Sequence, residues 1–243
     1  MSTVGNWRGP NIVKDGLVLY MDSSSPNSYY SPSSGITWSD ISGNFYEGTL
    51  TNVVTYIPIN GGTFLFDGAN SYITNIGNIS SFSFIQNTAV FTIDVWVKPY
   101  VLGGSIYIMG NNDGTSGAKG FFLGKLSDER LNFVLTYGVG GMTTLTFRQS
   151  NYFTDTNWIN IVISCNGVNA IAYKNGIQFG SISSTVSTLS TGDSSSVLGI
   201  GRINQSTTQY WNGYISTVKI YNRSLSPQEV LQNFNSVRSR FGI

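Results

Sequence analysis

The stretch WNGYISTVKIYNRSLSPQEVLQNFN, residues 211–235, contains a strand followed directly by a helix. Val218 and Ile220 alternate with more polar side chains, which is the pattern of a half-buried strand. Ser226 is then placed to cap a helix, Pro227 takes its first position and Glu229 completes a capping box. The apolar residues that follow at helical spacing are Val230, Leu231, Phe234 and Val237. This stretch predicts that one short helix closes a chain built otherwise of strands.

The composition is that of strands joined by polar turns. Hydrophobic residues make up 40% of the chain and charged residues only 10%, and there are 28 glycines among 243 residues. The hydrophobic share is enough for a real core, and β-sandwiches of this length are often single domains. We therefore expect one large all-β domain.

Short segments with period-two alternation recur along the whole chain. FTIDVWVKP, residues 91–99, places its apolar side chains on one face, and Pro99 ends it. Asn166-Gly167 and Asn175-Gly176 predict tight type I′ hairpins, because both central residues of that turn need positive φ. The other strands are predicted within residues 16–22, 38–52, 62–74, 105–109, 120–125, 130–137, 143–149, 158–181, 197–203 and 213–221. The pattern predicts a two-sheet antiparallel β-sandwich of about a dozen strands.

The first fifteen residues show no clear alternation, and glycine and proline break them up. We expect an N-terminal arm over residues 1–15, followed by a single domain over residues 16–243. Trp7 beside Arg8 in a free tail needs a surface to bury it, so these two are candidates for docking on a partner; a disordered terminus is the alternative.

Charge and cysteine content exclude several classes of protein. Thirteen Lys and Arg against twelve Asp and Glu leave a net charge of +1, without any basic run, so nucleic acid is not expected as a partner.

No run of about 18 apolar residues occurs, so no membrane span is expected. Cys165 is the only cysteine and cannot form an internal disulfide. The N-terminus lacks the pattern of a signal peptide, which favours synthesis in a cytosol without standard export.

No constellation in the sequence indicates catalysis. Histidine is absent, which removes Ser-His and Cys-His nucleophiles and His-ligated metal sites. Glycoside hydrolysis needs two carboxylates that flank the bond. The three glutamates, Glu47, Glu129 and Glu229, lie on separate predicted elements, and Asp94 has no second carboxylate nearby on its strand. We therefore predict no catalytic residues and a protein that is not an enzyme.

Three segments resemble the laminin-G-like, concanavalin-A-like lectin and glucanase family of jelly rolls. They are residues 211–235, WSDISGNFYEGTLTN at residues 38–52 and GTFLFDGANSYIT at residues 62–74. The resemblance spans roughly residues 16–235. It implies a jelly-roll fold and, since that family mostly binds and assembles, a binding function.

The two ends of the chain resemble laminin-G-like proteins encoded by tailed bacteriophages. The similar segments are GPNIVKDGLVLYMD, residues 9–22, and YNRSLSPQEVLQNFNSVRSRFG, residues 221–242. In those relatives the domain is inferred to be a capsid decoration or a fibre and tail appendage. The resemblance implies a structural protein located in the virion and made in the host cytoplasm. Its partners would be other capsid or tail proteins. The protein itself would be a homo-oligomer or would be displayed in many copies on the particle.

Calcium is the metal that the resemblance implies, bound by carboxylates and loop carbonyls at the edge of the sandwich. The candidates are Asp22, Asp67 and Asp113, the last within the turn Asn111-Asn112-Asp113-Gly114. Many relatives carry an acidic pair directly after the isoleucine of the final strand, whereas here Ser216 and Thr217 follow Ile215. Because that acidic pair is missing, the resemblance does not firmly imply calcium, and no other cofactor is implied. An Asp or Asn beside Gly also serves as a turn former.

A sugar site needs aromatic rings with amides and charged groups beside them, because a pyranose has an apolar face and a rim of hydroxyls. The best local cluster is Arg202, Asn204, Gln205, Tyr210 and Trp211, with the pair Tyr29-Tyr30 as a second. In the family pattern Trp211 opens the final strand, so packing in the core is the alternative for that residue.

Two functions thus follow from the sequence. The first is a non-enzymatic structural protein of a tailed-phage virion that acts through protein contacts, with glycan binding on its outer loops. The alternative is a carbohydrate-binding, lectin-like module of a surface adhesin.

Overall fold

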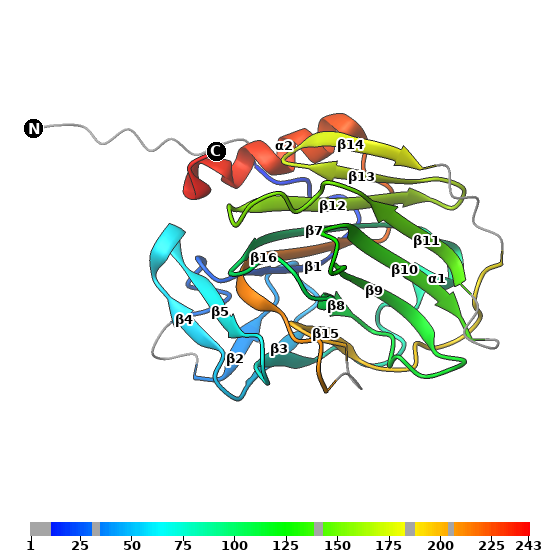
Figure 1. Ribbon diagram of the computed structural model, residues 1–243, viewed down its shortest axis with the longest axis horizontal. Coiled ribbons are helices and arrows are strands. Elements are labelled where there is room, and N and C mark those ends of the chain that lie inside the picture. The colour runs from blue at the N-terminus through cyan, green and yellow to red at the C-terminus, as the bar shows by residue number, and fades with distance from the viewer. Residues whose placement is uncertain (1–10, 31–34, 139–142, 183–187, 204–206) are drawn as a thin grey trace, which may run out of the picture.

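The computed structural model describes residues 11–30, 35–138, 143–182, 188–203 and 207–243. Within them the chain forms two antiparallel sheets packed face to face, as Figure 1 shows, which confirms the predicted β-sandwich. Sheet A runs in the order β14 (Ile177–Ile182), β13 (Ala170–Lys174), β12 (Ile159–Asn166), β7 (Val90–Pro99), β16 (Asn212–Tyr221), β5 (Thr63–Asp67) and β4 (Thr55–Ile57), and β1 (Leu17–Asp22) also pairs with β16. Sheet B runs in the order β11 (Thr143–Gln149), β10 (Leu131–Tyr137), β9 (Lys119–Lys125), β8 (Ile106–Gly110), β15 (Leu198–Ile200), β6 (Tyr72–Ile76), β3 (Glu47–Thr51) and β2 (Thr37–Ser39).

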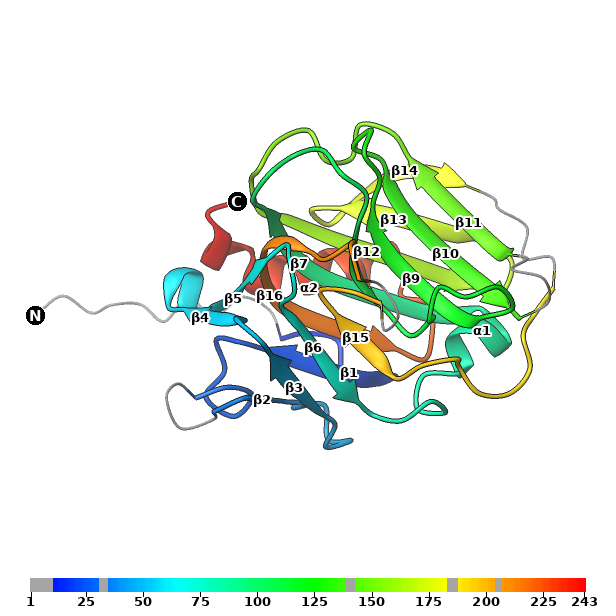
Figure 2. The same cartoon turned by 60° about the horizontal axis from the view of Figure 1, so that its bottom comes forward.

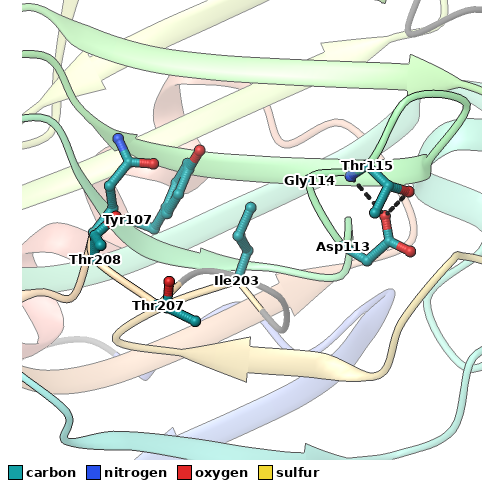
Figure 3. Close-up of a pocket in the computed structure, with 8 residues that line it drawn as sticks. Tyr107, Asp113, Gly114, Thr115, Ile203, Thr207 and Thr208 are labelled. Atoms are coloured by element: carbon teal, nitrogen blue, oxygen red, sulfur yellow. Dashed lines mark hydrogen bonds between the residues drawn. The ribbon is translucent and has the colours of Figure 1, made fainter.

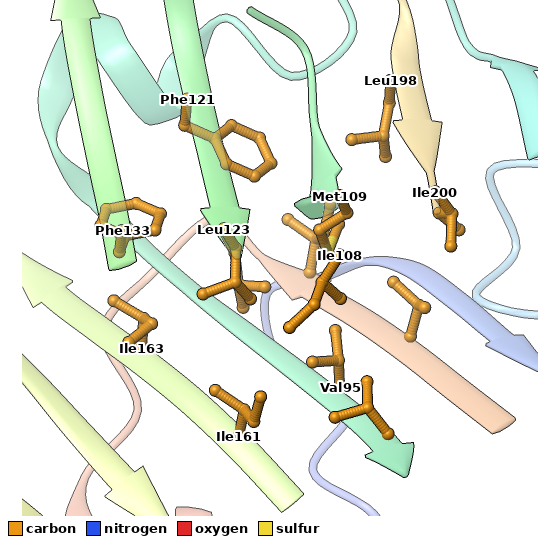
Figure 4. Packing of buried hydrophobic residues seen from close by; sticks show 14 of the residues in the cluster. Val95, Ile108, Met109, Phe121, Leu123, Phe133, Ile161, Ile163, Leu198 and Ile200 are labelled. Carbon is orange, nitrogen blue, oxygen red and sulfur yellow. The ribbon is translucent and has the colours of Figure 1, made fainter. Parts of the chain in front are cut away.

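The hydrophobic core fills the space between the two sheets. Side chains from both sheets meet there, as strand alternation requires. Figure 4 shows part of this cluster: Val95, Ile161 and Ile163 from sheet A, and Ile108, Met109, Phe121, Leu123, Phe133, Leu198 and Ile200 from sheet B. Burial of this apolar surface is the main source of stability.

The C-terminal helix, α2 (Pro227–Val237), begins as the sequence predicts. The Ser226 side chain accepts a hydrogen bond from the backbone N–H of Glu229, and the Glu229 carboxylate accepts one from the backbone N–H of Ser226. Hydrogen bonds from the Arg223 guanidinium lower the pKa of Glu229 to about 2, with further help from Ser226. The capping box is therefore reinforced by an ion pair.

The two predicted hairpins differ. Asn175 (φ 53°) and Gly176 (φ 75°) both lie in the left-handed region, which confirms the type I′ turn between β13 and β14. At the other site only Gly167 has positive φ, and Asn166 donates its backbone N–H to the carbonyl of Asn169. The type I′ prediction is wrong there, because Asn166 does not adopt positive φ and Cys165 pairs with Ala170, so the Asn-Gly pair is not the centre of a two-residue loop.

One short helix and two 3₁₀ turns have no counterpart in the sequence analysis. The helix α1 (Phe84–Thr88) ends at Ala89, which adopts a left-handed conformation. The 3₁₀ turns are η1 (Ile59–Gly61) and η2 (Arg238–Phe241). Elements this short carry too few turns for hydrophobic periodicity to reveal them.

Helix α2 covers the outer face of sheet A. In Figure 2, β9, β10 and β11 of sheet B lie in front and α2 lies behind β7 and β16. The Trp96 ring of β7 stacks with the ring of Phe234, at 5.6 Å between centroids, and with that of Phe241, at 4.1 Å. This aromatic stack and a second apolar cluster around Val230 seal the face that points away from sheet B.

Residues 11–15, the end of the predicted arm, lie against α2 and the turn before it. The backbone N–H of Val13 donates to Asn233 Oδ1 at 2.9 Å, and the Tyr221 hydroxyl donates to the Val13 carbonyl at 3.0 Å. Arg223 Nε lies 2.8 Å from a carboxylate oxygen of Asp15. Trp7 and Arg8 lie outside the described residues. No helix in the described part of the chain is long and apolar enough to cross a membrane.

A buried ion pair lies beneath α2. Lys219 Nζ of β16 is 3.4 Å from Asp94 Oδ2 of β7, and the two side chains are 0% and 1% exposed. Asn160 Nδ2 from β12 donates to Asp94 Oδ1 at 2.7 Å, and Asn233 Nδ2 from α2 reaches Asp94 Oδ2 at 3.4 Å. The Asp94 carboxylate thus joins three strands of sheet A to the helix that covers them.

We predict that Lys219→Met destabilises the protein by about 3 kcal/mol, because it leaves the Asp94 carboxylate buried without a counter-charge. The double variant Asp94→Asn with Lys219→Met should recover most of this loss, since it removes both charges and keeps an acceptor for Asn160. Urea unfolding of the three proteins measures both effects. A single variant as stable as the parent would contradict the role assigned to the pair.

Candidate functional site

A pocket of about 330 Å³ opens beside β8 and β15 of sheet B (Figure 3). Three parts of the chain line it: β8, the loop between β8 and β9, and the segment between β15 and β16. The lining residues are Tyr107, Asp113, Gly114, Thr115, Ile203, Thr207, Thr208 and Gln209. They combine one aromatic ring, an aliphatic side chain, hydroxyls, an amide and a carboxylate.

Tyr107 is held firmly in the wall of this pocket. Its ring meets the Phe122 ring edge-on at 5.2 Å between centroids. Its backbone N–H donates to the Gln209 carbonyl at 3.1 Å, which fastens β8 to the segment that follows β15. Burial raises the pKa of the Tyr107 phenol, so the hydroxyl stays protonated and can both donate and accept hydrogen bonds.

Asp113 supplies the carboxylate. Its Oδ1 accepts hydrogen bonds from the backbone N–H of Thr115 at 3.0 Å and from the Thr115 hydroxyl at 2.8 Å, both drawn in Figure 3. Oδ2 accepts none from the described residues. The turn therefore orients the side chain while leaving one oxygen available as an acceptor.

The predicted sugar residues are partly brought together, but outside this pocket. The Arg202 guanidinium lies over the Tyr72 ring, 3.4 Å from its centroid, and NH1 lies 3.4 Å from the Tyr210 hydroxyl. Tyr210 is only 7% exposed, and Trp211 is completely buried in the main core. Trp211 has no exposed ring face that a ligand could contact. It packs in the core, which the sequence analysis gave as the alternative to a sugar-binding role.

The predicted pair Tyr29-Tyr30 does not join the site. Tyr29 packs in the core while Tyr30 is 58% exposed, so the pair does not form one platform. Asn204 and Gln205 lie outside the described residues. The segment that the sequence analysis singled out, residues 202–211, contributes other residues to the pocket wall, among them Thr207, Thr208 and Gln209, and that analysis did not single out Tyr107. The sequence does contain a signal for Tyr107. This residue lies between Ile106 and Ile108 in an alternating strand, and alternation points its ring away from the core.

Asp22 does not fit a calcium site. Its side chain is 7% exposed. Arg240 NH1 donates to both carboxylate oxygens, to Oδ1 at 3.0 Å and to Oδ2 at 3.1 Å. The Tyr20 hydroxyl and the Ser24 side chain donate to the same carboxylate. A guanidinium therefore occupies the place that a cation would take.

Asp67 closes its own turn. Burial alone would raise its pKa, but hydrogen bonds from the Ser71 hydroxyl and from the backbone N–H groups of Ala69, Asn70 and Ser71 lower it to about 2. Asp113 lies in the pocket described above, and the described residues contain no group of three Asp, Glu, Cys or His that could hold a metal ion. The candidate carboxylates thus serve turns and ion pairs and do not converge on a calcium ion.

Three of the four carboxylates considered for catalysis, all except Glu47, are bound by partners of their own. Glu129 forms an ion pair with the buried Lys125 at 3.0 Å and also accepts a hydrogen bond from the backbone N–H of Gly103. Asp94 pairs with Lys219, and Glu229 pairs with Arg223 at 2.6 Å. Among the described residues that line the pocket, Asp113 is the one carboxylate.

The sequence places this chain in a known superfamily. The profile of the Concanavalin A-like lectin/glucanases superfamily, laminin G type, matches residues 67–231. The chain belongs to this superfamily, as the resemblance in the sequence implied. No curated protein matched the chain.

Solved structures with a similar fold include several binding domains. The binding domain of Paraclostridial Mosquitocidal Protein 1 is similar with a TM-score of 0.67 and 20% identity, over 92% of this chain and 52% of that one. The binding domain of Botulinum Neurotoxin DC, in complex with SialylT, has a TM-score of 0.68 and 19% identity, over 92% and 52%. Our chain thus spans about half the length of each.

A third similar structure corresponds to the domain as a whole. It is domain 4 of AbnA, a GH43 extracellular arabinanase from Geobacillus stearothermophilus, in complex with arabinotriose. Its TM-score is 0.64 and its identity 17%, over 90% of this chain and 98% of that one. At such identities these likenesses establish the shared fold.

We predict that removal of divalent metal leaves the stability of the protein unchanged. Excess EDTA should shift the unfolding temperature by less than about 1 °C, because a metal that does not bind the native state cannot stabilise it. Differential scanning fluorimetry with and without calcium measures this. A fall of several degrees that added calcium reverses would show that a structural ion is bound.

Proposed function

We propose that the protein is a non-enzymatic carbohydrate-binding module whose site is the pocket around Tyr107 and Asp113. The observation that carries this proposal is the composition of the pocket wall. One aromatic ring and one aliphatic side chain stand beside hydroxyls, an amide and an oriented carboxylate. A pyranose or furanose needs this combination, because it presents C–H groups on its faces and hydroxyls around its rim.

The charge of the wall favours neutral sugars over acidic ones. Its described lining contains Asp113 and no lysine or arginine. Arg202, the nearest cation along the chain, is stacked on Tyr72 and Tyr210. An anionic sugar would meet the Asp113 carboxylate without a compensating charge, so we expect neutral oligosaccharides to bind better.

Two of the similar structures support a glycan as the class of ligand. One of them is a complex with SialylT and the other a complex with arabinotriose. We propose that the protein does not cleave its ligand. Hydrolysis of a glycosidic bond requires two carboxylates, and the described lining of this pocket contains one, Asp113.

We expect the protein to bind a neutral oligosaccharide from a broad glycan array with micromolar to millimolar affinity, about 4 to 8 kcal/mol. Tyr107→Ala should weaken binding about tenfold, because the ring supplies the apolar contact. Asp113→Asn should weaken it less, since the amide oxygen can still accept from Thr115 and the NH2 group that replaces Oδ2 can donate to a sugar hydroxyl. Titration calorimetry with the best array ligand measures both.

Tyr100→Ala is the matched control for Tyr107→Ala. Tyr100 is a tyrosine that is 60% exposed and does not line this pocket. The Tyr100→Ala variant should therefore bind the sugar with the same affinity as the parent protein. Loss of affinity in the control but not in Tyr107→Ala, or silence of the folded protein across the array, would contradict the proposed site.

A role in a tailed-phage virion is proposed as the setting in which the module acts. Its support is the resemblance of the two ends of the chain and the low content of charged residues, 10%. Capsid or tail proteins would be the partners and a host glycan the ligand, and display in many copies would raise the avidity of a weak site.

Deletion of residues 1–10 tests the partner-docking role of Trp7 and Arg8. The deletion stops there because Val13 is bonded to Asn233 and Tyr221 and belongs to the fold. We expect the truncated protein to keep its unfolding temperature and its glycan binding but to lose incorporation into particles. Trp7→Ala with Arg8→Ala in the full chain is the finer version. Normal incorporation of both variants would reject the role of the arm.

A further inference from the structure

Phe45, in the loop that joins β2 to β3, has a conformation that the fold does not explain. Its φ is 59°, and 85% of the residue is exposed. Among the described non-glycine residues with positive φ, five are asparagines, which tolerate this region. Ala89 ends helix α1, and Glu129 holds the buried Lys125. Phe45 is the one aromatic residue among them.

A bulky side chain in the left-handed region is sterically unfavourable, and burial normally compensates for it. Here the ring is in solvent, so packing does not compensate. A glycine or asparagine at this position would satisfy the backbone better. Strain that the surrounding fold does not require indicates a functional reason for the side chain.

Phe45 is one of the residues that line a pocket of about 430 Å³ beside β2 and β3, at the edge of sheet B. Tyr46, which packs against Phe82 at 5.2 Å between ring centroids, lines the same pocket. Asp40, Glu47 and Asn27 also line the pocket. In sheet B the strands β15 and β6 lie between β8, which carries Tyr107, and β3, which carries Glu47.

The charge of this pocket is negative and is not compensated locally. Asp40 accepts hydrogen bonds from the backbone N–H groups of Tyr20 and Ser42 and from the Ser42 hydroxyl, all neutral donors. Glu47 is exposed and belongs to none of the ion pairs within the described residues. The described lining contains two carboxylates and no lysine or arginine.

We propose that this pocket binds a small organic ammonium ion, with its alkyl carbons against the face of Phe45 and its charge beside Glu47. An aromatic face attracts a weakly hydrated organic cation, and a carboxylate next to it adds the Coulomb attraction. A hard metal ion would gain nothing from the ring, and the oxygens of Asp40 are already used by its own loop. The aromatic wall therefore selects an organic cation over calcium.

Titration with choline, followed by NMR of the protein, tests the proposal. Choline should bind in the millimolar range, and its neutral isostere 3,3-dimethylbutan-1-ol should bind about tenfold more weakly, because it has the same shape without the charge. Glu47→Gln and Phe45→Leu should each weaken choline binding about fivefold. Tyr100→Leu, the matched change at another exposed aromatic, should leave it unchanged.

Phe45→Gly separates binding from folding. It should raise the unfolding temperature, because glycine adopts positive φ without strain, and it should lower choline affinity as Phe45→Leu does. Tyr107→Ala should keep choline binding, so failure of the glycan site and failure of this site are distinguishable. The proposal is overturned if choline does not bind, if the neutral isostere binds equally well, if Glu47→Gln has no effect, or if calcium alone displaces choline from the pocket.

Discussion

The buried pair of Asp94 and Lys219 is the constraint on which the arrangement of sheet A and helix α2 depends. Two charges removed from water are tolerated only when the geometry and the additional hydrogen bonds are good. Asn160 and Asn233 supply those hydrogen bonds from β12 and from α2. Asn233 in turn accepts from the backbone of Val13, so the helix, three strands and the N-terminal segment are held by one polar network.

This network determines which face of the sandwich is available for function. Since α2 and its aromatic stack cover the outer face of sheet A, the pocket around Tyr107 and Asp113 opens on sheet B. The carboxylates that sequence alone left open for metal binding or catalysis are mostly bound elsewhere. Asp22 pairs with Arg240, and Glu129 pairs with Lys125. The few charges of this chain thus largely stabilise its loops and its covered face.

Features that depend on neighbouring residues were predictable from the sequence. The capping box of Ser226 and Glu229 and the type I′ turn at Asn175-Gly176 need only local chemistry, and both are present. The fold class followed from alternation repeated over many segments. Contacts between distant residues were not predictable in this way, because the residues that meet are far apart along the chain. Arg240 reaches Asp22 across 218 residues, and no local pattern announces that pair.

The site shows the same division. The aromatic residues in 202–211 drew attention to a segment that contributes Thr207, Thr208 and Gln209 to the pocket wall. Hydropathy could not decide which of the rings are buried, and Trp211 lies in the core. Tyr107 enters the pocket only because β8 and β15 pair across a long connection. Phe45 could not be recognised from composition, since its significance is its backbone conformation.

We propose above all that a neutral oligosaccharide binds between β8 and the segment before β16 without being cleaved. Chemical-shift mapping of the amide resonances with the best glycan ligand tests it most directly. We expect the largest shifts at Tyr107, Asp113, Gly114, Thr115 and Thr208, with the sugar recovered intact. Shifts confined to other parts of the surface, or release of shorter sugars by the purified protein, would contradict the account.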